Sequence, residues 1–426
     1  MAEHRRSQPA RLLVLGAGAA QLGLLQAAAA RDVTVIAVDR DPLAVGFALA
    51  DERAVISSED EQGIDRLARA RAVDGLISPG ADWPVGIAAR VAERLGLPHP
   101  IDGATAVLST TKTRQRERFA SAGVLQPRTF SVSDPAIPFP CVVKAPDRQG
   151  QRGLTLVDTS SAFAAAVGAA VAESRGGGVL VEELIDGPEL TVNAVSRDGA
   201  FIPLTVTDRL LAEPPAFGVA LAHVWPSCHP TDSVIEAARA AVAALGIDNG
   251  PSYTQIRLGP DGRPYVVEVA ARLGGGHDAE LCCAAVGVDL NDLAVSFALG
   301  EDPCHTVSQA SLAHVAHLAA YSAGEWVPRH KVSQAGDRGS GGACILFLVA
   351  PEGVLLETEG VEAAEAMEGV EWVRTYRSPG WRFGPLRRGA DRAGAILATG
   401  DDREDALARA RRAARAVRFL VDANPS

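Results

Sequence analysis

Two lysines stand on either side of a polar, glycine-bearing loop. Lys112 lies at the head of a predicted helix, and Lys144 ends a predicted strand that runs into the loop 147–153. The backbone N–H groups of such a loop can surround an anion, and lysines supply compact positive charge to phosphate oxygens. One such lysine alone is usually a solvated surface charge. Two lysines around this loop favour a phosphate site.

Acidic side chains follow at the end of a later predicted strand. Glu182 and Glu183 precede Leu184, and Glu189 comes just beyond the turn at 186–188. The backbone of an edge strand can read adenine, while a carboxylate accepts hydrogen bonds from ribose hydroxyls. Solvated acids beside a turn are the alternative.

Gln255 and Glu268 fall on facing positions of one predicted hairpin, whose turn is Pro-Asp-Gly at 260–262. Oxygen ligands that converge from neighbouring strands suit Mg²⁺, whose other ligands are phosphates and waters. Arg272 follows Glu268 by four residues and opens the glycine loop 274–276. Its guanidinium group can bind a carboxylate or an acyl-phosphate in bidentate fashion. A plain cross-strand polar pair is the alternative.

The pattern Gly16-x-Gly18-x-x-Gln21 follows the first predicted strand, and Asp39 ends the second. This arrangement resembles a dinucleotide fingerprint, in which glycines admit a pyrophosphate and the acid binds a ribose. The third glycine position carries Gln21, which weakens the match. A tight turn without a nucleotide is an equal alternative, so a nicotinamide-dependent oxidoreductase remains open on these residues.

The first hundred residues alternate short apolar strands with helices, which predicts a doubly wound parallel sheet. After a predicted helix at 113–122, strands arrive in pairs separated by tight turns. The predicted pairs are 141–144 with 154–157, 189–196 with 201–207, and 252–258 with 265–271. Helices are predicted at 160–174, 232–245 and 289–299, and after Asp401. The fold class is therefore α/β followed by α+β, with a strand-rich C-terminal extension.

Composition excludes several classes of protein. A chain of 426 residues has room for two or three lobes, and its net charge of −11 argues against a nucleic-acid surface. No apolar run approaches the roughly 20 residues that a membrane span needs. The six cysteines show no metal-binding spacing, which is typical of reduced thiols and predicts a cytoplasmic protein.

Taken together and in this order, these segments resemble the ATP-grasp superfamily over essentially the whole chain. The similar segments are the first helix with its lysine at 112–128, the second phosphate lysine at 141–144, the phosphate lid at 147–153, the adenine–ribose segment at 182–189, and the metal and substrate signature at 267–275. The resemblance implies a pre-ATP-grasp domain at 1–108, a small ATP-binding lobe at 109–186, and a large lobe with its extension at 187–426. It also removes the dinucleotide interpretation.

Within the superfamily, the chain is most similar to carboxylate–amine ligases that include bacterial L-amino-acid ligases. The segments that carry this likeness are 207–209, 223–227, 274–277, 287–290 and 393–410. Biotin carboxylases fit less well at 190–193. The resemblance implies ATP as cosubstrate, Mg²⁺ with Mn²⁺ as an alternative, and small carboxylate and amine substrates. No nucleic acid or membrane partner is expected, and a homodimer is left open.

The resemblance also implies a role for each site residue. The cofactor-binding residues are Lys112, Lys144, Gly150, Arg152, Gly153, Glu182, Glu183, Leu184 and Glu189. Gln255 and Glu268 are the metal ligands, and Arg272, His223, Gly275 and Gly276 bind the substrates. Arg272 and His223 are in addition the catalytic candidates, with His223 considered as the general base.

Three departures from the pattern affect the expected function. The first metal carboxylate is Gln255, and an expected asparagine is Ala270. These two changes favour, as one alternative, a degenerate ATP-binding protein without turnover. Another alternative is an ATP-grasp ligase of the purine-biosynthesis or biotin-carboxylase type.

The third departure concerns the carboxylate donor. Amino-acid ligases place a glutamate three residues before the histidine, where this chain has Ala220. A buried ammonium without a counter-charge is costly, so the sequence predicts a donor without a free α-ammonium group, or a larger substrate. Gly276 is expected to leave room in the acceptor region. The alternative is that Asp208 or Glu213 supplies the missing negative charge.

Overall fold

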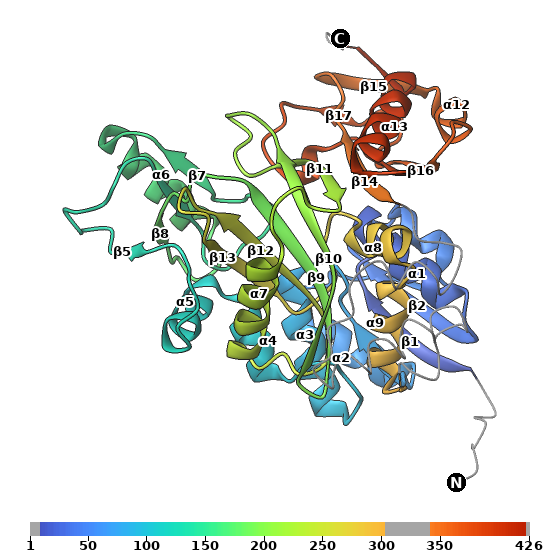
Figure 1. Cartoon of the computed structure of the whole chain (residues 1–426). Coiled ribbons are helices and arrows are strands. Elements are labelled where there is room, and N and C mark those ends of the chain that lie inside the picture. Colours follow the sequence, from blue (N-terminus) through green and yellow to red (C-terminus); the bar gives the residue numbers. More distant parts are fainter. Residues whose placement is uncertain (1–8, 303–340, 423–426) are drawn as a thin grey trace.

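The computed structural model describes residues 9–302 and 341–422, and it contains four β-sheets (Figure 1). The first sheet is parallel with strand order β3-β2-β1-β4. Its strands are β1 Ala10–Leu15, β2 Val33–Asp39, β3 Glu52–Val55 and β4 Gly75–Ile77, and its helices are α1 Leu22–Ala29, α2 Glu61–Ala70 and α3 Asp82–Leu95. Parallel sheets need cover on both faces. Leu12 and Val14 accordingly pack into one core, and Leu13 and Leu15 into another.

The glycine turn after β1 is closed by the protein's own side chains. The Asp39 carboxylate accepts hydrogen bonds from the backbone N–H groups of Ala17, at 2.9 Å, and Asp41, at 3.0 Å. The Gln21 side chain lies 3.2 Å from where a Cβ atom on Gly16 would be, and it also packs against Gly18. The acid that a dinucleotide site would use is therefore engaged in holding the turn.

A second, antiparallel sheet forms the small lobe, with strand order β5-β8-β6-β7. Its elements are α4 Gly103–Thr110, α5 Lys112–Ser121, β5 Thr129–Phe130, β6 Cys141–Lys144, β7 Thr155–Val157, α6 Ser160–Glu173 and β8 Leu180–Glu183. Cys141 and Val143 on β6 pack with Ala166 and Ala170 of α6. The loop between β6 and β7 is the predicted lid.

The largest sheet has eight strands in the order β13-β12-β9-β10-β11-β14-β18-β16. Its first five strands are β9 Glu189–Arg197, β10 Ala200–Leu211, β11 Ala220–Trp225, β12 Gly250–Leu258 and the edge strand β13 Pro264–Ala270. Helix α7, Asp232–Ala244, covers one face, where Leu190 and Val192 are fully buried. On the other face, α8 Asp278–Val286 and α9 Leu290–Leu299 connect this sheet with the N-terminal unit (Figure 1).

The C-terminal extension continues the large sheet. It contributes β14 Gly342–Leu348, β16 Val370–Thr375 and β18 Gly394–Gly400 to that sheet. A small three-stranded sheet adds β15 Gly353–Glu359, β17 Arg382–Phe383 and β19 Arg418–Asp422, with helices α12 Val361–Glu365 and α13 Arg403–Ala416. The small lobe and this extension lie toward opposite ends of the picture, on either side of the long strands β9 and β10 (Figure 1). The predicted α/β followed by α+β fold is confirmed.

Among the described residues, no single helix is long and apolar enough to cross a membrane. Helices α8 and α9 reach that length and composition only as a pair, and they bend by 115° at the break between them.

Candidate active site

The register of the large sheet arranges polar side chains in two rows on one face. One row is Glu268, Gln255, Thr191 and Thr207, and the next is Arg257, Glu189, Arg209 and His223. Alternate residues of a strand point to the same face of a sheet, so the two rows lie side by side. The opposite face carries the apolar side chains that pack on α7. The face-to-face pairing predicted for Gln255 and Glu268 is confirmed.

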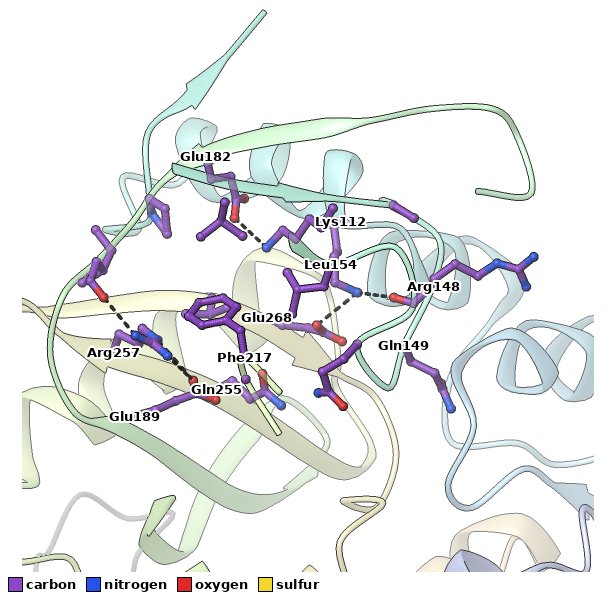
Figure 2. A pocket seen from close by; sticks show the side chains of 18 of the residues that line it. Lys112, Arg148, Gln149, Leu154, Glu182, Glu189, Phe217, Gln255, Arg257 and Glu268 are labelled. Atoms are coloured by element: carbon purple, nitrogen blue, oxygen red, sulfur yellow. Dashed lines mark hydrogen bonds and ion pairs between the residues drawn. The ribbon is translucent and has the colours of Figure 1, made fainter. Parts of the chain in front are cut away.

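A cleft lies between this polar face and the small lobe (Figure 2). Its lining includes most of the predicted site residues, namely Lys112, Lys144, Gly150, Arg152, Glu182, Glu183, Leu184, Glu189, Gln255, Glu268 and Arg272. It also includes Arg148, Gln149, Gln151, Arg209, Phe217 and Arg257, which the sequence did not single out. The predicted residues Gly153, His223, Gly275 and Gly276 are not part of this lining.

The two lysines that are predicted to bind phosphate are buried, and each already contacts an acid. Lys112 Nζ lies 3.1 Å from Glu268 Oε2 and donates a 2.8 Å hydrogen bond to the backbone carbonyl of Arg148 (Figure 2). Lys144 Nζ lies 2.5 Å from Glu182 Oε2. Burial lowers the pKa of Lys144, and Glu182 opposes this only in part. Both ammonium groups therefore stand fixed at the cleft.

Glu182 is an internal counter-ion in this structure. Its second oxygen lies 2.5 Å from Arg116 Nε, so both oxygens are engaged by cations. Burial alone would raise the pKa of Glu182, but Arg116 and Lys144 outweigh burial and lower it. Glu183 pairs with Arg128 at 2.7 Å. A nucleotide base would therefore meet this strand through its backbone more readily than through these carboxylates.

The predicted ribose acid, Glu189, lies between two arginines. Arg209 binds one of its oxygens, and Arg257 Nη2 lies 3.0 Å from the other. Burial alone would lower the pKa of Arg209, but Glu189 and other nearby groups outweigh burial and raise it. Arg257 also donates to the carbonyl of Ile185, at 3.1 Å. Any ribose hydroxyl that binds Glu189 must share the carboxylate with these guanidinium groups.

Gln255 and Glu268 fit a divalent cation. Burial alone would raise the pKa of Glu268, but Lys112 and Lys144 outweigh burial and keep the carboxylate ionised. One carboxylate and one amide oxygen then face the cleft from paired strands. This is the oxygen donor set of a hard cation that takes its other ligands from phosphates and water.

Arg272 ties the large sheet to the N-terminal unit. Its Nη2 and Nε atoms lie 2.5 Å and 2.6 Å from Asp82 Oδ1, at the first turn of α3. Burial alone would lower the pKa of Arg272, but Asp82 and Glu268 outweigh burial and raise it. The guanidinium group is thus held in position at the edge of the cleft.

The lid loop contacts every surrounding unit. In addition to the Lys112 contact with the Arg148 carbonyl, Gln149 Oε1 accepts a hydrogen bond from the Asp82 N–H. Gln151 Oε1 accepts one from the Gly389 N–H of the C-terminal extension, at 3.0 Å. The lid is therefore closed over the cleft in this structure.

His223 lies deeper, at the end of the second row. Its Nδ1 atom is 2.9 Å from Asp278 Oδ1, and both side chains are buried. His223 Nε2 has no hydrogen-bond partner among the described residues. Burial alone would raise the pKa of Asp278, but His223 outweighs burial and lowers it. An acid that fixes Nδ1 leaves Nε2 as the nitrogen that can exchange a proton with a ligand.

Gly276 packs closely against two rings of the protein, and its role in leaving room for an acceptor stays a prediction. A Cβ atom there would lie 2.7 Å from His223 Cε1 and 3.2 Å from Phe347 Cζ. The absent side chain therefore makes space for the protein's own rings. Gly275 is exposed and faces the backbone carbonyl of Gly80 at the N-terminal unit.

Of the two acids considered as substitutes for the glutamate missing at Ala220, one is engaged within the protein and the other is exposed. The Asp208 carboxylate is bound by Arg403, by Ser227 Oγ at 2.5 Å and by the Cys228 N–H at 3.0 Å. Glu213 is exposed. The group that does reach Ala220 is a cation, since Arg392 Nη1 lies 3.3 Å from the Ala220 carbonyl oxygen.

Comparison with known proteins supports the fold. Residues 130–304 match the family described as carbamoyl-phosphate synthase L chain, ATP binding domain, and residues 346–422 match L-amino acid ligase C-terminal domain 2. The L-amino acid ligase from Bacillus licheniformis has a similar structure, with a TM-score of 0.78, 19% sequence identity, and coverage of 98% of this chain and 100% of that one.

Two curated relatives match over shorter stretches. Carnosine synthase 1 of Gallus gallus is 30% identical over 183 residues, or 39% of this chain and 20% of that protein. The ATP-grasp enzyme fsqD of Aspergillus fumigatus is 27% identical over 220 residues, or 47% of this chain and 38% of that protein. The chain thus spans less than half the length of either relative. With the fold, the two domain matches identify ATP-grasp domains in this chain. Its C-terminal region is similar to that of L-amino acid ligases.

Proposed function

We propose that this protein is an ATP-dependent ligase that joins a carboxylate to an amine through an acyl-phosphate. The observation that carries the proposal is the convergence in one cleft of Lys112, Lys144, the lid, the Gln255–Glu268 pair and Arg272. The names of the relatives agree, because carnosine synthase and L-amino acid ligase describe amide-forming enzymes.

In the first step, Lys112, Lys144 and the backbone of the lid bind the ATP phosphates. Glu268 and Gln255 would hold Mg²⁺, which neutralises phosphate charge when it is bound. A carboxylate oxygen of the donor attacks the γ-phosphorus, and the bond between that phosphorus and the leaving ADP oxygen breaks. Positioning and charge neutralisation supply most of the rate enhancement in such transfers.

In the second step, the amine nitrogen attacks the acyl carbon, and inorganic phosphate leaves. Arg272 stabilises the oxyanion or the departing phosphate, and its link to Asp82 orients it for this role. The amine loses one proton in this step. His223 Nε2 is the candidate acceptor, because Asp278 fixes the other ring nitrogen.

The donor of the proposed reaction lacks a free α-ammonium group. Where amino-acid ligases place a glutamate, Ala220 is accompanied by the guanidinium group of Arg392, which would repel an ammonium. Kinetics with matched donors, one bearing the α-amino group and one lacking it, test this point. A clear advantage for the α-amino donor that Ala220→Glu does not increase would refute it.

Three predictions from the sequence belong to the same proposal. The protein acts in the cytoplasm on small molecules, without nucleic acid. Residues 1–108, 109–186 and 187–426 act as its pre-ATP-grasp, small-lobe and large-lobe units. The bound cation is Mg²⁺, with Mn²⁺ as the alternative.

The decisive experiment follows phosphate release from MgATP with a panel of carboxylates and amines, together with the mass of the ligated product. A new mass equal to the sum of both substrates minus water is the expected result. Binding of MgATP without turnover on any pair would favour the degenerate protein suggested by Gln255 and Ala270. Thermal stabilisation by NAD(H) in place of MgATP would refute both.

A further inference from the structure

Arg392 differs from the other enclosed arginines around the site. Arg116, Arg209 and Arg272 each hold a carboxylate of the protein. Arg392 instead donates to two backbone carbonyls, Gly389 at 2.8 Å through Nε and Ala220 at 3.3 Å through Nη1. Within the described part of the chain, it forms no ion pair with a carboxylate.

The electrostatics of Arg392 reflect this difference. Burial lowers its pKa to about 10, and the charge of Arg209 acts in the same direction. The nearby groups Tyr376, Tyr253 and Asp278 oppose the decrease without reversing it. An enclosed cation without a counter-ion is costly to the folded state, so its position calls for an anion from outside the protein.

A chain of contacts links Arg392 to the substrate end of the site. Its guanidinium carbon lies 3.6 Å from the centroid of the Phe347 ring. That ring meets His223 edge to face, with centroids 5.5 Å apart. His223 is directly opposite Arg209 on the neighbouring strand. Arg392 is therefore outside the lining of the nucleotide cleft and is linked to the proposed proton acceptor through the Phe347 ring.

Two buried nitrogen atoms in this region also lack hydrogen-bond partners among the described residues. They are Arg209 Nε and His223 Nε2. The side chains of Arg209 and His223 are only 7% and 3% exposed, so water cannot easily satisfy them. Arg209 Nε is a donor that an anionic ligand can satisfy, and Arg392 is a cation without a carboxylate partner in the described part of the chain, so this end of the sheet suits an anionic ligand. His223 Nε2 keeps a lone pair beside them, because Asp278 lies at Nδ1.

We propose that Arg392 binds a carboxylate group of the substrate that is not consumed in the ligation. The proposal rests on the ligase function above and adds the class of substrate. The carboxylate has two possible sources, the α-carboxylate of an amino-acid acceptor or the second carboxylate of a dicarboxylic donor.

The test uses matched ligand pairs on the full-length protein. Each C4–C6 dicarboxylate is paired with its monocarboxylate, and each amino acid with its amide. Binding is measured by calorimetry with a nonhydrolysable ATP analogue and magnesium, and turnover by phosphate release. The wild-type protein should prefer the carboxylate-bearing member of one pair type by roughly tenfold to a hundredfold, the effect of one charge-assisted contact. The pair type that shows the preference identifies the source.

In Arg392→Gln, the ratio of the two affinities within that pair should fall close to one. The affinity for the ATP analogue should stay unchanged. Arg392→Lys keeps the positive charge but not the planar guanidinium group, so it should retain part of the preference. This variant replaces Arg392→Gln in the test if Arg392→Gln does not fold. Arg377→Gln is the matched control, because Arg377 also stacks on an aromatic ring, 4.1 Å from the Trp381 centroid, and donates to backbone carbonyls.

Two outcomes would overturn the proposal. One is the absence of any preference in the wild-type protein, and the other is a preference that survives in Arg392→Gln. If no pair supports turnover, the ligase proposal fails, yet the calorimetric comparison still decides the role of Arg392.

Discussion

The nucleotide end and the substrate end of the site handle their charges differently. At the nucleotide end, Lys112, Lys144 and Glu189 already have partners of opposite charge. At the proposed substrate end, His223 Nε2 has no hydrogen-bond partner and Arg392 has no carboxylate partner among the described residues. Paired charges hold their geometry before a ligand arrives, which suits a cosubstrate shared by a whole superfamily. Unpaired groups gain their partner from the ligand, which suits selection of a particular substrate.

The largest expected effect follows Glu268→Ala, which removes the one carboxylate assigned to the metal. Ligation should fall by about a thousandfold or more, because several kcal/mol of charge stabilisation are lost. Lys112 also loses its 3.1 Å partner. Phosphate release at saturating substrates measures the effect, with Glu268→Gln as the isosteric control. Near-wild-type turnover of Glu268→Ala would remove the metal assignment.

Lys144→Ala should reduce turnover by about a hundredfold, as expected for the loss of one donor to transition-state charge. From the residue type alone the fold is expected to stay intact, since removing a polar side chain leaves no apolar cavity. The 2.5 Å contact with buried Glu182 changes that expectation. Removing one partner of a buried ion pair is destabilising, although Arg116 still holds Glu182.

The stability of Lys144→Ala is checked by urea unfolding. A decrease of about 2 kcal/mol in the free energy of unfolding is expected, below the usual range for a broken buried pair because Arg116 remains. Arg116→Ala is the companion variant, since it breaks the same cluster without removing a phosphate ligand. If Arg116→Ala loses as much turnover as Lys144→Ala, the lysine acts through Glu182 and not on phosphate.

Contacts between residues that are close in the sequence were predictable, whereas contacts between residues far apart in the sequence were not. The pairing of Gln255 with Glu268 was predictable, because a short turn fixes the register of a hairpin. The ion pairs were not, since Arg116 and Glu182 are 66 residues apart and Arg272 and Asp82 are 190 apart. No local pattern signals such contacts.

Two elements at the substrate end were not predicted, because their own sequences give weak signals. Strand β11 is short and follows a proline-containing loop, and α8 is an apolar helix whose side chains are mostly buried, without a polar stripe. His223 and Asp278, which meet at 2.9 Å, belong to these two elements. The functions assigned to the individual site residues stay predictions.

Glu280 tests whether the C-terminal extension is joined firmly to the substrate end. Its carboxylate lies 2.7 Å from Arg374 Nη1 and 3.2 Å from His277 Nδ1. Burial alone would raise the pKa of Glu280, but His277 and Arg374 outweigh burial and lower it from 4.5 to about 2. A lowered pKa in the folded state stabilises the protein above the unfolded-state value, and this stabilisation disappears as the pH falls from 4.5 toward 2.

The expected result is a wild-type advantage over Glu280→Gln of roughly 2–3 kcal/mol at neutral pH. The advantage should shrink steadily through the acid range, as measured by urea unfolding at several pH values. Glu371→Gln, an exposed acid of the same extension that contacts Thr399, is the control. A difference between Glu280→Gln and wild type that does not change with pH would contradict the ionic explanation.

The smallest expected effect comes from the lid, where two glycines have similar backbones but different surroundings. Gly150 has φ +67° and Gly153 has φ +65°, so an alanine at either position is strained by about 1 kcal/mol. A Cβ atom on Gly150 would meet nothing within 4 Å, whereas one on Gly153 would lie 2.9 Å from Glu173 Cβ and 3.0 Å from Ala145 Cβ. Only Gly153→Ala should therefore weaken the packing of the lid against α6.

Hydrogen exchange of residues 147–153, with and without a nonhydrolysable ATP analogue, measures this difference. In the wild-type protein the loop should exchange quickly alone and slowly with the analogue, because lids of this kind order over phosphates. Gly150→Ala should keep most of that protection, and Gly153→Ala should lose several-fold more of it, with a matching rise in the Michaelis constant for ATP. Equal protection with and without nucleotide would mean that the contacts to Asp82 and Gly389 alone keep the lid closed. In that case, closure would precede ATP, and the lid would belong with the preformed, charge-paired end of the site.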